Sequence, residues 1–160
     1  MNTPNIYRDT FKNWVENSAT DTDFANGLEI KDFYYADASR FIEAQRSKIE
    51  YPALILETPT YYYPPNFTGE FKVKLRGAYS VVKGCKVDDY PDQDDAMNLC
   101  LKIGIRVLNK IKASIKAQGA FFDNDTIIEP VLSIMTDNNY GYRFEFQLNN
   151  IFLSELSPCP

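Results

Sequence analysis

The chain has 160 residues, 44% of them apolar and 14% aromatic, and its net charge is −5. This length suits one domain with one core, and the apolar content argues against a disordered protein. The negative charge argues against general nucleic-acid binding, which depends on clustered Lys and Arg. Histidine is absent, which removes the commonest general base and the commonest metal ligand.

Three cysteines, Cys85, Cys100 and Cys159, stand at wide and irregular spacing. An odd number at such spacing fits neither a disulfide framework nor a zinc site, so we expect a reduced, intracellular setting. Cys100 lies among apolar helix residues and is expected in the core. The N-terminal residues lack a signal-peptide pattern, and no apolar run approaches the roughly 20 residues that a membrane helix needs. We therefore expect no membrane association.

In chain order, the first predicted element is a helix over 4–17, with Thr3 as its cap and Pro4 at its first position. A short strand is expected within 28–35, followed by a second helix over 38–47. Residues 51–57 contain the run Ala-Leu-Ile-Leu, which predicts a strand buried on both faces.

A Pro-rich, aromatic loop over 59–69 is expected next. Residues 70–83 then alternate between apolar and basic side chains, which predicts a strand with one buried face. Gly77 is expected to bend or bulge this strand.

The longest predicted element is a helix over 91–118, with aspartates in its first turns, lysines near its end and Gly119 as its terminator. Its apolar stripe comprises Ala96, Leu99, Cys100, Ile103, Val107, Ile111 and Ile115, widened by Met97, Leu101, Ile105 and Leu108. So wide a face implies two neighbours: the sheet, and either another helix or another subunit.

Two further strands are predicted over 126–136 and 142–148, joined by a hairpin loop over 137–141. Together these elements predict an α+β fold: a single domain over 1–150, with a mostly antiparallel sheet packed against one long helix and additional N-terminal helices. Residues 151–160 form an apolar tail that contains proline and needs a place to dock.

The aromatic loop and the tail are the predicted interface regions. Proline stiffens the loop, and Tyr and Phe are favoured contact residues. The predicted interface residues are Tyr61, Tyr62, Tyr63, Phe67, Ile151, Phe152 and Leu153. The alternative is that the loop folds back on its own sheet.

Lys72, Lys74 and Arg76 place three cations on one face of the strand over 70–83. They could meet DNA phosphates or an acidic partner. The alternative is a solvated face, or pairing with carboxylates such as Glu57 or Glu145, and the negative net charge favours this alternative.

The clusters of acidic residues are better explained by a structural role than by cation binding. The aspartates at 88–95 could bind a cation, but at a helix start they satisfy free amides and the dipole. The segments 21–23 and 123–125 lack the full calcium-loop pattern and are predicted to be turns. No nucleotide-binding, nucleophile or zinc motif is present, so we expect no catalytic residue, no metal site and no cofactor.

Three segments carry a family resemblance: the run over 49–57, the Asp-led long helix, and the run over 137–146. Together with the element order they resemble the tail-terminator and neck proteins of tailed bacteriophages. The resemblance implies a homo-oligomeric, often hexameric ring that ends the tail tube and joins it to the head. It also implies tail-tube and neck or connector partners, assembly in the host cytoplasm, a place in the virion and proximity to DNA.

Two other functions stay open. A monomeric protein-binding module or assembly chaperone would expose a single contact patch. An enzyme that works without histidine would have a deep pocket with convergent polar groups. A ring subunit would instead bury a large self-interface, often more than about 2,000 Å².

Overall fold

Two long antiparallel strands, β4 (Lys72–Gly84) and β7 (Asn139–Phe152), form the centre of the sheet. The computed structural model describes residues 4–25, 27–35, 49–62, 72–86, 88–116, 119–123, 125–132 and 138–152. The helical elements there are α1 (Pro4–Glu16), η1 (Thr22–Phe24) and α3 (Tyr90–Lys116). The shorter strands are β1 (Asp32–Tyr35), β2 (Ala53–Leu56), β3 (Thr60–Tyr62), β5 (Phe121–Phe122) and β6 (Ile127–Leu132).

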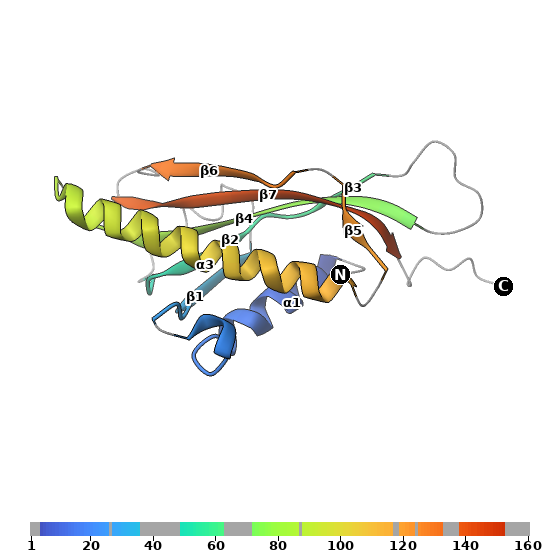
Figure 1. Ribbon diagram of the computed structural model, residues 1–160, viewed down its shortest axis with the longest axis horizontal. Helices are drawn as coiled ribbons and strands as arrows, with labels where there is room; N and C mark the ends of the chain where they lie inside the picture. Colours follow the sequence, from blue (N-terminus) through green and yellow to red (C-terminus); the bar gives the residue numbers. More distant parts are fainter. Residues whose placement is uncertain are drawn as a thin grey trace.

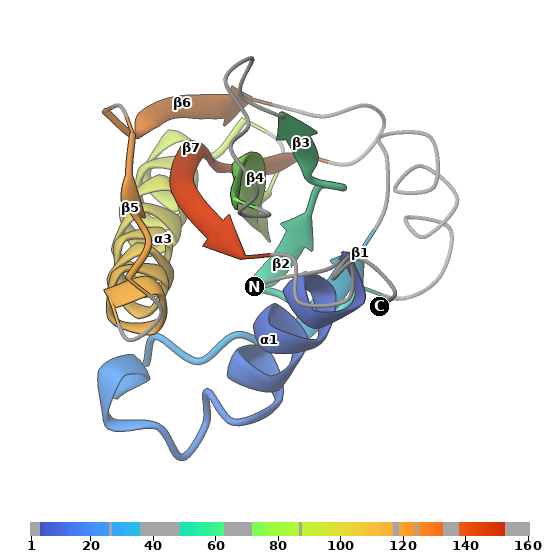
Figure 2. The same ribbon diagram turned by 90° about the vertical axis from the view of Figure 1, so that its right-hand side faces the viewer.

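The strand order is β1-β2-β4-β7-β5, with β3 also paired to β4 and β6 also paired to β7 (Figure 1). The β1–β2 pair is parallel, and the other pairs are antiparallel. Both α1 and α3 contribute to the core on one face of this sheet (Figure 2). The described residues therefore form the predicted α+β fold, with a mostly antiparallel sheet against one long helix.

Alternation along the central strands creates the buried face. In β4, Val73, Leu75, Tyr79 and Val81 are buried, as are Phe144, Phe146 and Leu148 in β7. These side chains meet the buried stripe of α3 and the ring of Phe11 in α1. Burial of this apolar surface, at roughly 25 cal/mol per Å², is the main force that holds the helices on the sheet.

Polar groups at the two ends of α3 confirm how this helix begins and ends. The Asp89 carboxylate accepts a hydrogen bond from the Asp92 amide at 3.1 Å, and Asp92 accepts one from the Lys86 amide at 2.9 Å. Gly119, with φ of +71°, follows the helix in the left-handed conformation that glycine favours. The helix-start interpretation therefore holds for Asp89, which caps a free amide of the first turn. Within the described ranges, no group of three or more cysteine or acidic residues could hold a metal ion.

Several predicted boundaries and contacts are corrected. Residues 60–62, expected in a loop, form β3, because they pair with β4. Residues 139–141, expected in a hairpin turn, begin β7, and β7 runs past the predicted domain end at residue 150. The register irregularity of β4 lies between Val73 and Leu75, whereas Gly77 makes room for the Tyr7 hydroxyl and the Phe146 ring.

The apolar face of α3 is narrower than predicted. Ile105 is 41% exposed, whereas Leu99 and Leu101 are partly buried and pack against the core as predicted. The predicted second helix over 38–47 lies outside the described residues. No helix in the described part of the chain combines the length and apolarity needed to cross a membrane.

Candidate interaction site

A charged network lies on the sheet face opposite to α3. The Arg143 guanidinium donates to both carboxylate oxygens of Glu57, at 2.6 and 2.9 Å, and to Glu145 at 3.0 Å. Arg76 also pairs with Glu145, so that one carboxylate lies between two guanidinium groups. The pKa of Glu145 lies below its ordinary value, mainly because Arg143 donates a hydrogen bond to this carboxylate. A depression of about 140 Å³ opens beside this network.

The predicted basic strand face is largely matched by carboxylates. Lys74 binds Asp123 at 2.9 Å, and Asp123 also accepts a hydrogen bond from Gln147. Arg76 binds Glu145, one of the two carboxylates considered from the sequence. The ion-paired interpretation therefore describes Lys74 and Arg76. The backbone of Lys72 pairs with Phe152, and its side chain lies outside the described part.

The predicted aromatic interface divides between the two sheet faces. Tyr61 packs against the core, and burial raises the pKa of its hydroxyl to about 12. Tyr62, on the opposite face, is exposed. The pairing of β3 with β4 means that this part of the predicted loop folds back on its own sheet.

The other predicted interface residues are less fully described. Tyr63, Phe67 and Leu153 lie outside the described residues. Ile151 and Phe152 continue β7, and their backbones pair with Val73 and Lys72.

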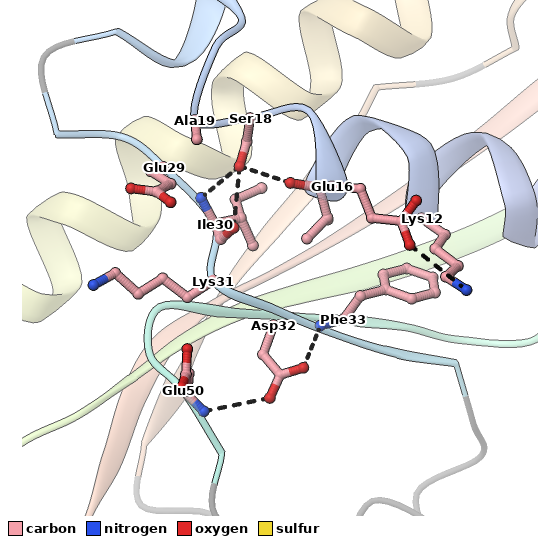
Figure 3. A pocket seen from close by; sticks show the side chains of 11 residues that line it. Lys12, Glu16, Ser18, Ala19, Glu29, Ile30, Lys31, Asp32, Phe33 and Glu50 are labelled. Carbon is pink, nitrogen blue, oxygen red and sulfur yellow. Dashed lines mark hydrogen bonds and ion pairs between the residues drawn. The ribbon is translucent and has the colours of Figure 1, made fainter.

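A wider depression, of about 450 Å³, opens between the end of α1 and the segment that leads into β1 (Figure 3). Its lining residues are Lys12, Val15, Glu16, Ser18, Ala19, Glu29, Ile30, Lys31, Asp32, Phe33 and Glu50. The charged lining residues include both lysines and carboxylates, and Lys12 and Glu16 form an ion pair at 3.6 Å.

The most enclosed polar groups of this depression are already used by the fold. The Ser18 hydroxyl bonds to the backbone of Val15 and Ile30. The Asp32 carboxylate accepts from the Phe33 amide at 2.9 Å and from the Tyr34 hydroxyl at 2.7 Å. The Ser18 bonds join the end of α1 to the segment before β1, so the depression lies over a structural joint.

The edge strand β6 exposes apolar side chains on both of its faces. Ile127, opposite Glu145, is 51% exposed, and Ile128, opposite Phe144, is 40% exposed. In the described part of the chain, β6 pairs only with β7. Pro130 has no amide hydrogen, which a sheet tolerates at an open edge. Exposed apolar edges promote association and are usually covered or blunted in soluble proteins. The edge of β6 is therefore the strongest candidate contact surface.

The long helix extends this apolar surface. Gly104 lies against the Phe144 ring, and Phe144 is the β7 neighbour of Ile128. Ile105, the next residue of α3, is exposed. Lys112, two turns further on, lies over the ring of Phe122 in β5, which marks this side of the helix as the one toward β5 and β6. Ile105 and Ile128 thus belong to one side of the molecule.

Sequence reasoning missed this surface, although one signal was present. A proline inside an apolar strand-like run indicates an edge strand, and Pro130 follows Ile127 and Ile128 at short distance. The exposure of Ile105 had no such signal, because a residue at helical spacing with a buried stripe is normally expected to be buried.

Comparison with known proteins identifies no relative of this chain. No protein-family model matches the sequence, and neither the curated proteins nor the solved structures contain a match.

Proposed function

We propose that this protein is a structural subunit that acts through assembly, as the resemblance to phage tail-terminator and neck proteins implies. In this proposal, copies of the chain form a ring that ends a tail tube and joins it to the head. The chain has no catalytic role in it. The observation that supports this proposal is the open edge of β6, where two consecutive isoleucines are exposed.

A closed ring would account for the exposed edge of β6. In a ring, each subunit presents two different patches, and each patch is covered by a neighbour. The apolar side chains of β6 and Ile105 would be buried in such a contact, whereas a monomer leaves them in water. The proposal assigns no DNA contact to Lys74 or Arg76, because carboxylates already match both cations.

The test is the native mass of the purified protein over a wide concentration range, by light scattering behind a sizing column, with negative-stain microscopy of any large species. We expect a discrete oligomer that appears as a ring. Ile128→Lys should shift the mass toward the monomer, since burial of an unpaired ammonium in an apolar contact is unfavourable.

The matched control is Ile6→Lys, which changes an exposed isoleucine of α1 in the same way. It should leave the mass unchanged. A strict monomer at every concentration, alone and with a tail-tube protein, would contradict the ring and favour the monomeric binding module.

A further inference from the structure

The geometry points to a head-to-tail contact between copies of this chain. In this contact the start of α3 of one copy docks against the α3–β6 surface of the next copy. We define the acidic tip as Asp88, Tyr90, Asp94 and Asp95. We define the α3–β6 surface as Lys102, Ile105, Arg106, Lys112 and Ile128. This inference rests on the proposed self-assembly and names the two patches that meet.

The acidic tip is built as a projecting contact. The start of α3 extends beyond the ends of β4, β6 and β7 along the long axis of the molecule (Figure 1). Tyr90, its first residue, is 74% exposed, and the three tip aspartates are also exposed. An exposed tyrosine supplies contact area and a hydroxyl at low conformational cost, which makes it a favoured interface residue.

The tip aspartates differ from their neighbours. Asp89 and Asp92 accept hydrogen bonds from backbone amides that precede or begin the helix. Asp94 and Asp95 form no ion pair within the described ranges. Their charge is therefore available to a partner.

The α3–β6 surface has the opposite charge. Lys102, Arg106 and Lys112 are exposed, and none of them pairs with a carboxylate in the part of the chain that the structure describes. In α3 they surround the exposed Ile105: Lys102 lies one turn before it, Arg106 directly after it and Lys112 two turns after it. Lys110, one turn after Arg106 in the same helix, is instead held by Asp21 and Asp23. A partner for this surface must combine apolar and acidic groups.

The acidic tip of a second copy meets this requirement. It carries three carboxylates for the three cations, and Tyr90 for the isoleucines. The nearest residues of the two patches, Asp95 and Lys102, lie about 10 Å apart along α3, given a rise of about 1.5 Å for each of the seven residues between them. Because the patches differ, the contact is heterologous and repeats from copy to copy, as a ring requires.

A charge exchange tests the contact directly. The tip variant is Asp94→Lys with Asp95→Lys, and the surface variant is Lys102→Glu with Arg106→Glu. Each variant alone should associate roughly tenfold more weakly than the native chain or worse, since like charges then face each other. An equimolar mixture should recover the assembly, because each reversed patch now meets a reversed partner. Sedimentation velocity measures the species, and circular dichroism confirms that each variant is folded.

The matched control reverses two cations elsewhere: Lys12→Glu with Lys31→Glu changes the net charge as the surface variant does. It should leave the assembly intact. If both contact variants assemble like the native chain, or if the mixture fails to recover, the head-to-tail contact is overturned while the ring stands. A native chain that forms only a dimer overturns the head-to-tail arrangement. A native chain that is always monomeric overturns the proposed function as well.

Discussion

The Tyr79 hydroxyl donates a hydrogen bond to the Gly104 carbonyl oxygen at 2.8 Å, and so links the middle of β4 to the middle of α3. The same glycine makes room for the Phe144 ring, which stacks on the Tyr79 ring with a centroid separation of 5.0 Å. Helix, tyrosine and phenylalanine therefore meet at one point. This point sets how closely α3 approaches the sheet, and with it the position of Ile105 and of the basic residues beside it.

We predict that Gly104→Ala destabilises the protein. In an exposed helix interior, alanine is more stable than glycine by about 1 kcal/mol. Here an added methyl group would overlap the Phe144 ring, and overpacking of a core costs about 1–3 kcal/mol. The expected net loss is up to about 2 kcal/mol in the free energy of unfolding, measured by urea denaturation.

Two variants give this prediction its control. Asn98→Ala, at an exposed position of the same helix, should be neutral or slightly stabilising, because it changes helix propensity alone. Phe144→Leu combined with Gly104→Ala should lose less stability than the two single losses added together, because the smaller side chain leaves space for the methyl group. A Gly104→Ala variant more stable than the native chain would contradict the close approach.

The sequence predicts those parts of the fold where a local pattern determines the environment. Alternation in 70–83 identifies the buried face of β4, and the aspartates, lysines and Gly119 locate α3 within two residues at its start and end. Pairing between distant segments has no such local signal. The attachment of β3 to β4 and the exposure of Ile105 depend on which strand becomes a neighbour, and that is decided by tertiary packing.

The candidate site illustrates the same limit. Arg76 and Glu145 are separated by 69 residues, and the sequence leaves their ion pair as one of several options because it does not specify the strand register. The tip aspartates and the basic residues of α3 are visible in sequence as dipole-compatible charges. Their exposure, and the projection of the tip beyond the sheet, come only from the three-dimensional arrangement (Figure 1).

We predict that Glu145 contributes stability that acid removes. Arg143, and then Arg76, hold its pKa below the ordinary glutamate value of about 4.3. The folded state therefore binds a proton less readily than the unfolded state. This stability is fully present above the ordinary pKa and is lost as the pH falls through the lowered folded-state value.

Glu145→Gln tests this linkage. The variant should be less stable than the native chain at pH 7, and the difference should shrink as the pH falls below about 4.3, in urea denaturation at a series of pH values. Glu29→Gln, at an exposed carboxylate, is the control and should show little difference at any pH. A constant difference across the series would exclude the ionised carboxylate as the source.

We predict that Lys110 holds the η1 segment on α3. Its ammonium group binds Asp21, reaches Asp23 at 2.8 Å and lies over the Phe24 ring. The hydrogen bond from Lys110 is the main reason that the pKa of Asp21 is lowered. In Lys110→Met, hydrogen exchange of amides at 21–25 should become several-fold faster, with smaller changes in β4 and β7. Lys102→Met, which removes an exposed cation, should leave this exchange unchanged, and equal exchange in both variants would contradict the clamp.

The last prediction uses the thiol of Cys100 to report on the packing of α3. Burial raises the pKa of Cys100 to about 12, so the reactive thiolate is scarce at neutral pH and the sulfur is covered as well. Alkylation by iodoacetamide should therefore require an opening of the structure, and its rate should follow the population of the open state. Gly104→Ala should raise this rate, by about tenfold for each 1.4 kcal/mol that it removes.

Cys85 is the control within the same chain, because it is only partly buried and should react without the global opening. Mass spectrometry separates the two sites by peptide. If Gly104→Ala accelerates Cys100 and leaves Cys85 unchanged, the loss of stability arises where helix and sheet meet. Equal acceleration at both cysteines would place it elsewhere.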